Sequence, residues 1–178
     1  SRCSTAQIHL TSRAAAATPR GRKVDMFFAV ITCRRNAHVW EAFRSLIRAW
    51  GSGQRVKVDY RLFVGSSGNG TRERVLNVAG RANGDVVVLD ADDGYENLVN
   101  KVTAAMRWSV SNVRADYFIK IDDDVFVSIR AMWERIVALK LPKVRLYAGS
   151  AVPQGYPIIR TEGHKWALPR AQYEPNEL

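Results

Sequence analysis

Two kinds of apolar pattern alternate along the chain. Val24–Thr32 and Asp85–Leu89 are nearly continuous apolar runs, which are typical of strands covered on both faces of a sheet. Apolar residues at helical spacing predict helices over Ala37–Trp50, Tyr95–Val110 and Ile129–Leu139. The remaining expected elements are a strand over Val56–Gly65, a short helix over Thr71–Ala79, a strand over Asp116–Ile121 and a short fifth strand over Arg145–Ser150.

This order of elements indicates the fold class. Strands that alternate with helices pair in parallel through right-handed crossovers, so the pattern predicts a three-layer α/β fold. Residues 1–23 mix Ser, Thr, Ala and Arg and are expected to form a flexible tail or linker, which leaves residues 24–178 as the folded domain. Ligands of such sheets bind beyond the carboxyl ends of the strands.

Three adjacent carboxylates, Asp122, Asp123 and Asp124, follow the apolar strand that begins at Asp116. They repel one another, and a divalent cation would convert that repulsion into shared coordination by hard oxygen ligands. In an extended chain Asp122 and Asp124 point to one side and Asp123 to the other, so one pair can face a metal. The alternative is an acidic loop between a strand and a helix.

Polar clusters follow two other predicted strands. They are Thr32-Cys33-Arg34-Arg35 after the first strand and Asp90, Asp92 and Asp93 after the third. Because the carboxyl ends of parallel strands meet at one edge, these clusters and the acidic triplet are expected to lie together. Basic and acidic groups at one edge suit a phosphate held partly by arginine and partly by a metal.

Composition narrows the possible partners. The net charge of +10 favours anionic partners such as phosphates, nucleic acid or an anionic membrane surface. The basic residues are scattered and carry no nucleic-acid-binding signature, so a nucleic-acid partner is not expected. Two cysteines are too few for a disulfide framework or a cysteine-rich zinc site. No apolar run is long enough to span a membrane.

Several motifs, in order along the chain, resemble those of one family. They are the strand Phe27–Thr32 followed by Arg44-Ser45-Leu46-Ile47-Arg48-Ala49-Trp50-Gly51, then Leu62-Phe63-Val64-Gly65, the block from Gly84-Asp85 through Asp93-Gly94-Tyr95-Glu96-Asn97-Leu98 to Lys101, the block Lys120-Ile121-Asp122-Asp123-Asp124-Val125-Phe126-Val127, and the late segments Tyr147-Ala148-Gly149-Ser150 and Lys165-Trp166-Ala167-Leu168-Pro169. This set resembles the β-1,3-glycosyltransferases, which include galactosyl- and N-acetylglucosaminyltransferases.

The resemblance implies a GT-A-type nucleotide-sugar-binding fold, incomplete on its acceptor side. It implies UDP-galactose or UDP-N-acetylglucosamine as donor, a glycan acceptor and Mn²⁺. Asp124 would be the direct metal ligand, and Asp122 would lie nearer the ribose and the metal-bound waters. The other donor-binding residues implied are Asp93 beside the uridine, Arg44 and Arg48 on the diphosphate side, and Thr32, Lys101 and Asp123.

Some of these assignments have structural alternatives. The alternative role of Arg44 and Arg48 is that of surface charges on an amphipathic helix. For Lys101, as for Tyr95 and Asn97, the alternative role is helix capping and packing, although a cation there would temper the charge of the neighbouring aspartates.

The resemblance also implies a location and leaves one role open. Relatives act on the lumenal side of the Golgi membrane, so an anchor is expected upstream of Ser1.

An inverting transfer needs a catalytic base, and the family's acidic block for that role has no match after Pro169. His164 is a tempting base, but a lone loop histidine is more often simply exposed. The function expected is therefore an inverting, Mn²⁺-dependent hexosyltransferase. The alternative is a UDP- and metal-binding module that lacks the base.

Overall fold

The structure is a computed structural model that describes residues 23–51, 54–66, 83–149, 158–164 and 167–170. The chain divides into two compact units, Ser1–Lys143 and Val144–Leu178. The expected tail over residues 1–23 lies outside the described residues except for Lys23, and the expected helix over Thr71–Ala79 lies wholly outside them. The division into a tail and a domain over residues 24–178 stays a prediction.

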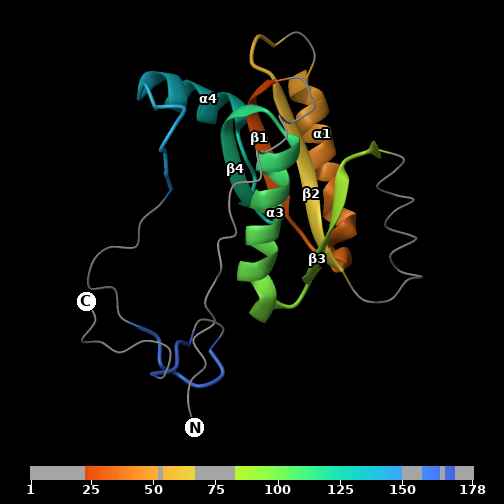
Figure 1. The fold of residues 1–178 in the computed structure, drawn as a ribbon, viewed down its shortest axis with the longest axis vertical. Helices are drawn as coiled ribbons and strands as arrows, with labels where there is room; N and C mark the ends of the chain where they lie inside the picture. Colours follow the sequence, from red (N-terminus) through yellow and green to blue (C-terminus); the bar gives the residue numbers. More distant parts are fainter. Residues whose placement is uncertain (1–22, 52–53, 67–82, 150–157, 165–166, 171–178) are drawn as a thin grey trace, which may run out of the picture. The chain divides into compact units, whose positions relative to one another are not determined.

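The described part of the first unit contains a four-stranded sheet in the order β3-β2-β1-β4 (Figure 1). Its strands are β1 (Val24–Ile31), β2 (Val58–Ser66), β3 (Val86–Asp92) and β4 (Ala115–Asp122). All three neighbouring pairs are parallel. The most apolar run of the sequence therefore forms β1, one of the two inner strands of this sheet, as expected for a strand with a helix layer on each side.

Helices cover both faces of this sheet. α1 (Trp40–Gly51) and α4 (Ile129–Ala138) cover one face, and α3 (Leu98–Asn112) covers the other (Figure 1). Successive residues of β1 point into the two different cores, Met26, Phe28 and Val30 into the first and Phe27, Ala29 and Ile31 into the second. The predicted three-layer α/β fold is confirmed.

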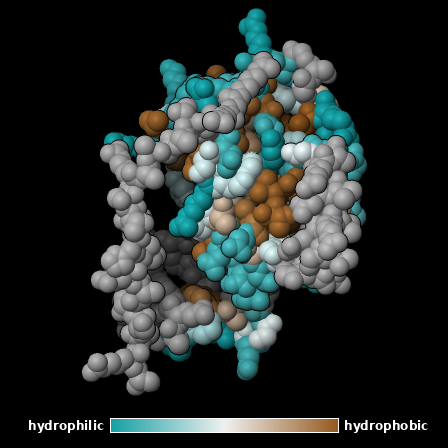
Figure 2. Space-filling view, turned by 45° about the vertical axis from the view of Figure 1, so that its right-hand side comes forward, coloured by the Kyte–Doolittle hydropathy of each residue, from teal (hydrophilic) through white to brown (hydrophobic). Residues whose placement is uncertain are grey.

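The outer surface of the first unit is mixed rather than uniformly polar. On the face seen in Figure 2, hydrophilic side chains surround a central group of apolar ones. α3 leaves Val99, Met106 and Val110 exposed on its outer side. No helix among the described residues has the length and apolar character needed to cross a membrane.

Two predicted helices begin later than the apolar spacing indicated. A 3-10 turn, η1 (Arg34–Val39), precedes α1, and a second one, η2 (Tyr95–Asn97), precedes α3. The side chains of a 3-10 turn recur every three residues, so its apolar spacing resembles the start of an α-helix.

The predicted fifth strand is wrong over the residues that are described. Residues 145–149 form no strand, and Ser150 lies outside the described residues. Arg145 has a left-handed backbone with φ of 55°, which interrupts an extended chain, and Tyr147 is fully exposed. An alternating apolar pattern forms a strand only where a neighbouring strand and a packing layer are available.

The described residues of the second unit form turns and irregular chain. Backbone hydrogen bonds join Leu168 N to Ile159 O at 2.9 Å and His164 N to Thr161 O at 3.1 Å. The Arg160 guanidinium also donates to the carbonyl oxygen of Leu168. The segments on either side of residues 165–166 are thereby tied to each other.

Candidate functional site

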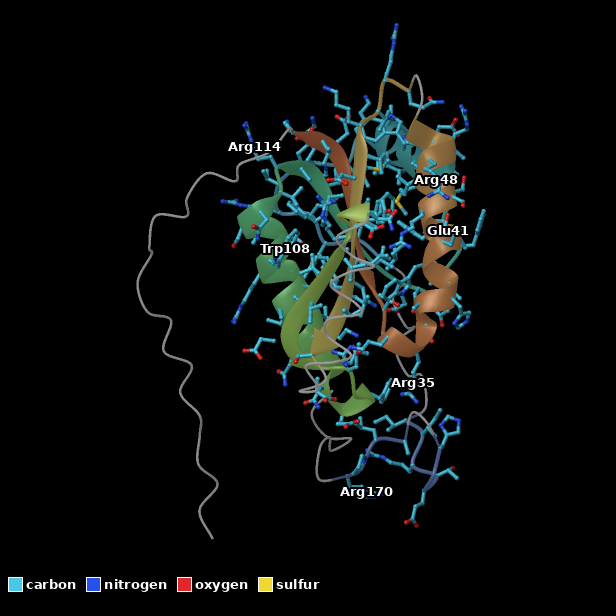
Figure 3. The ribbon with its side chains drawn as sticks, turned by 90° about the vertical axis from the view of Figure 1, so that its right-hand side faces the viewer. Arg35, Glu41, Arg48, Trp108, Arg114 and Arg170 are labelled. Atoms are coloured by element: carbon cyan, nitrogen blue, oxygen red, sulfur yellow. The ribbon has the colours of Figure 1, made fainter. Side chains whose placement is uncertain are left out.

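The polar clusters of the sequence meet at the carboxyl edge of the sheet. β1, β2, β3 and β4 all end there because every pair is parallel. Figure 3 shows Arg35, just beyond β1, and Arg114, just before β4, at opposite ends of the sheet. The three polar clusters meet at this edge, as predicted. Thr32 is hydrogen-bonded to Asp123, and the backbone N–H of Arg34 is hydrogen-bonded to Asp93.

Thr32, directly after β1, is the centre of these contacts. Its hydroxyl group donates to Asp123 Oδ2 at 2.5 Å and accepts from Trp40 Nε1 at 2.8 Å. Its backbone N–H donates to Phe63 O at 3.0 Å, and its carbonyl oxygen accepts from Lys101 Nζ. Thr32 is only 3% exposed. The residue therefore ties parts of the edge together, and its burial does not support direct contact with a donor.

Asp93 and Lys101 form a second group of contacts at the edge. Asp93 Oδ1 accepts from Gly65 N at 2.6 Å and from Lys101 Nζ at 2.5 Å. Asp93 Oδ2 accepts from Arg34 N at 3.4 Å. The Lys101 side chain is 4% exposed, and so buried a charge requires a paired partner. Lys101 is therefore a buried partner that holds Asp93 in place, while the Asp93 side chain is 20% exposed.

The acidic triplet begins at the last residue of β4. Asp122 accepts from Lys120 Nζ at 2.8 Å, whereas Asp123 Oδ2 accepts from Thr32 and from Asn36 Nδ2, the latter at 2.9 Å. Asp122 and Asp123 thus turn to different partners, as strand alternation predicts. Asp124 lies in the turn after β4 and is exposed, with no hydrogen bond or ion pair to other described residues. Alternation therefore does not fix the side to which Asp124 points.

The donor set of the triplet fits a divalent cation. Asp122 and Asp124 offer carboxylate oxygens at the surface, the ligands that Mg²⁺, Mn²⁺ and Ca²⁺ prefer. Among the described residues no three His, Cys, Asp or Glu side chains form a metal-binding group. Two carboxylates would leave coordination positions open, which suits a metal that also binds a phosphate-bearing ligand.

Arg44 and Arg48 are not brought to this edge. Arg44 pairs with Asp85 through two hydrogen bonds, Nε to Oδ2 at 2.7 Å and Nη2 to Oδ1 at 2.9 Å. Asp85 precedes β3, so this pair lies at the start of a strand whose carboxyl end carries Asp92. Arg48 pairs with Glu41 on the exposed side of α1 (Figure 3). Arg48 therefore has the alternative role of an exposed surface charge. Arg44 belongs to a largely buried ion pair with Asp85. Neither position supports contact with a diphosphate.

The Arg44–Asp85 pair has clear electrostatic consequences. Burial raises the pKa of Asp85, but hydrogen bonds from Arg44 and from the Tyr60 hydroxyl outweigh it and hold that pKa below its ordinary value. Burial and the hydrogen bond to Asp85 raise the pKa of Tyr60. Asp85 is therefore a carboxylate and Tyr60 a neutral phenol at neutral pH.

A separate hollow lies at the opposite, amino edge of the sheet. Its volume is about 550 Å³, and its lining includes Val24, Trp50, Trp108 and Arg114. Val24 opens β1, and Arg114 directly precedes β4. The hollow therefore lies at the other end of the strands from the acidic triplet, and none of the three aspartates lines it.

The sequence analysis missed several residues that shape the edge. Asn36, in η1, donates a hydrogen bond to Asp123, and Trp40, at the start of α1, donates one to Thr32. Lys120 pairs with Asp122. Gly65 allows the end of β2 to pass against the chain at Ala91–Asp93. The Lys120 pairing had a usable signal, since residues two apart in a strand share a face. The sequence carries no signal for the direction of the Trp40 indole, which sits in an ordinary apolar stripe.

One family profile and several named transferases match this chain. The Galactosyltransferase family profile matches residues 42–178, more than half of the chain. Beta-1,3-galactosyltransferase 1 of Homo sapiens is 25% identical over 150 residues, which cover 82% of this chain and 46% of that protein. A lactosylceramide 1,3-N-acetyl-beta-D-glucosaminyltransferase of Danio rerio is 29% identical over 143 residues, covering 74% of this chain and 38% of that protein.

A plant relative matches a shorter stretch. A hydroxyproline O-galactosyltransferase of Arabidopsis thaliana is 35% identical over 97 residues, covering 52% of this chain and 14% of that protein. The chain thus spans less than half the length of each of these relatives. The family profile and the α/β fold agree with the motifs of the sequence, and the chain belongs to the galactosyltransferase family.

Proposed function

We propose that the chain is an inverting, Mn²⁺-dependent hexosyltransferase that moves galactose or N-acetylglucosamine from a UDP-sugar to a glycan in β-1,3 linkage. The observation that carries the proposal is the acidic triplet at the carboxyl edge, where Asp122 and Asp124 are accessible and Asp123 is held by hydrogen bonds from Thr32 and Asn36. Relatives named as 1,3-galactosyl- and 1,3-N-acetylglucosaminyltransferases support this reaction class.

The residues divide between holding a cation and supporting the edge. Asp122 and Asp124 would hold Mn²⁺, which when bound offsets the negative charge that develops on a departing diphosphate. Asp93 keeps part of its carboxylate exposed at the same edge and would accept a hydrogen bond from the nucleoside. Lys101 and Thr32 are buried, and their role is to fix Asp93 and Asp123 in place.

The base of an inverting transfer is not assigned among the described residues. Such a base must lie within hydrogen-bond reach of the acceptor hydroxyl group. Glu162 and His164 are exposed, and both belong to the second unit. The competing proposal is therefore a module that binds UDP and a metal but transfers no sugar.

Binding and turnover measurements on the full chain separate these proposals. UDP and Mn²⁺ are titrated by calorimetry, and donor hydrolysis and transfer to glycan acceptors are assayed with and without EDTA. Binding with turnover that Asp124→Ala abolishes supports the transferase, and binding without turnover supports the module. Glu134→Ala removes an exposed carboxylate of α4 and is the matched control. UDP binding that EDTA leaves unchanged would contradict the metal role in both proposals.

The cellular location follows from the same proposal. A Golgi enzyme that uses UDP-sugars works on the lumenal side of the membrane and is held there by an anchor. Microscopy of the tagged full-length protein, with protease protection of the tag in sealed vesicles, tests this location. A tag that is digested in intact vesicles would contradict it.

A further inference from the structure

We propose that Thr32, Trp40 and Asn36 are positioning residues that set the acidic triplet for cation binding by fixing Asp123. This inference rests on the proposed function, because it concerns the same cation. None of the three would touch the metal or the donor. They act through the central carboxylate of the triplet, which β1, η1 and α1 together hold in place.

The Trp40 indole determines where the Thr32 proton goes. An indole N–H only donates, so Thr32 Oγ1 must accept the 2.8 Å bond from Trp40 Nε1. The hydroxyl group has a single proton to give, and its nearest acceptor is Asp123 Oδ2 at 2.5 Å, against 3.4 Å to Cys33 O. A short hydrogen bond to a carboxylate is of the strong, charge-assisted kind. Trp40 thereby orients Thr32, and Thr32 holds Asp123.

Asn36 adds a second donor to the same oxygen. Its Nδ2 lies 2.9 Å from Asp123 Oδ2, so that oxygen accepts from both Asn36 and Thr32. The central carboxylate is thus held by two hydrogen bonds from the protein. Because Asp123 is joined by peptide bonds to Asp122 and Asp124, fixing it also restricts the backbone that carries the two accessible carboxylates.

The support for Asp123 is itself rigid. Thr32 is anchored by its amide to Phe63 O and by its carbonyl oxygen to Lys101 Nζ, and Trp40 is 2% exposed. A cation site pays less entropy on binding when its ligands are already held in place. Partners that orient metal ligands typically contribute tenfold to a hundredfold in metal affinity, although those partners contact the ligands directly.

The test measures Mn²⁺ affinity of the full chain in the presence of UDP, from the electron paramagnetic resonance signal of free Mn²⁺. Thr32→Val keeps the side-chain shape and removes the hydroxyl group, and it is expected to weaken Mn²⁺ binding roughly tenfold. Thr32→Ser keeps the hydroxyl group and is expected to restore most of that affinity. A role in core packing alone would instead leave Mn²⁺ affinity unchanged in every variant that folds.

Two tryptophan variants provide an independent arm. Trp40→Phe removes the indole donor to Thr32 and is expected to weaken Mn²⁺ binding several-fold. Trp50→Phe is the matched control: it lies on the same helix and loses an indole hydrogen bond to Val56 O, at 3.2 Å, near the opposite edge. Trp50→Phe is expected to bind Mn²⁺ as the wild type does.

The outcomes separate this inference from the proposed function. A wild-type chain that binds neither Mn²⁺ nor UDP overturns the proposed function itself. A wild-type chain that binds both, with Thr32→Val and Trp40→Phe binding equally well, overturns only the positioning role. Should Thr32→Val fail to fold by circular dichroism, Trp40→Phe and Asn36→Ala decide the same question.

Discussion

Gly65 lies where β2 ends and its backbone passes directly against the chain that leaves β3. A Cβ atom at this position would lie 2.4 Å from Ala91 O and 2.8 Å from Asp93 N. Both are backbone atoms, so the overlap cannot be relieved by rotating a side chain. The same close approach lets Gly65 N donate to Asp93 Oδ1 at 2.6 Å. The absence of a side chain thus allows Asp93 to be held at the edge.

Gly65→Ala is therefore expected to destabilise the fold. Forcing one extra methyl group into packed backbone costs about 1–3 kcal/mol, which urea unfolding measures as a lower midpoint. Gly94→Ala is the matched control, because a Cβ there meets the side-chain ends of Glu96 and Asp92, which can move. Its expected change is within about 0.5 kcal/mol. Equal stability of Gly65→Ala and the wild type would contradict the close approach.

For single residues, the sequence indicates which charged side chains matter, but not which residues they contact. Asp93 and Asp123 were identifiable because each follows an apolar strand, where a charge needs a partner or ligand, whereas Lys101 was indicated by the family resemblance. The contact of Asn36 with Asp123 was not, because it joins positions 87 residues apart and depends on the η1 turn. Arg44 was misleading for a related reason: its partner Asp85 also lies far along the chain.

At the scale of elements, one buried ion pair joins α1 to the start of β3. Arg44 comes from the middle of α1, Asp85 precedes β3, and Tyr60 of β2 donates to the same carboxylate at 2.6 Å. The side chains of Arg44 and Asp85 are 12% and 5% exposed. Removing one partner of a buried pair leaves the other charge unpaired, so Asp85→Asn is expected to cost roughly 3 kcal/mol at neutral pH.

This cost should depend on pH in a defined direction. The pKa of Asp85 is lower in the folded state than its ordinary value of 3.8, so the folded state binds fewer protons there than the unfolded chain does. The stability that Asp85 contributes is complete well above that value and is lost as the pH falls through the lower folded-state pKa. The difference between wild type and Asp85→Asn should therefore be constant from about pH 7 to 5 and shrink below about pH 4.

Urea unfolding of both proteins across this pH range measures that difference directly. Asp116, whose pKa hydrogen bonds from Lys143 and Lys23 also lower, is present in both proteins, so its contribution cancels. Glu134→Gln, an exposed carboxylate on α4, is the control expected to match the wild type throughout. A difference between wild type and Asp85→Asn that grows on acidification would contradict the assigned pairing.

The elements themselves were largely predictable, because the sheet is parallel and buried. β1 and β3 begin in nearly continuous apolar runs of the sequence, and β1, which is buried on both faces, is the clearest case. The helix starts were less predictable, since η1 and η2 share the apolar spacing of the helices that they precede. The fifth strand failed because the short apolar stretch at residues 144–147 is exposed rather than packed on a sheet.

At the scale of the whole first unit, the two ends of the sheet differ in chemistry. The carboxyl edge carries the acidic triplet and its supports, and the amino edge carries the hollow beside Trp50 and Trp108. The net charge of +10 attracts anions to either end. Charge alone therefore does not determine where a nucleotide binds. A cation that requires Asp122 and Asp124 would direct the nucleotide to the carboxyl edge.

Ligand-dependent stability tests this choice on the intact chain. A ligand that binds only the folded state stabilises it by about 2.7 kcal/mol at one hundred times its Kd. Mn²⁺ and UDP together are expected to raise the wild-type melting temperature, and EDTA should reverse the rise. Asp124→Ala should show no rise, because the shared cation is lost and the nucleotide then lacks its bridge to the edge. An equal rise in Asp124→Ala would instead place the nucleotide elsewhere, with the amino-edge hollow as the next site to test.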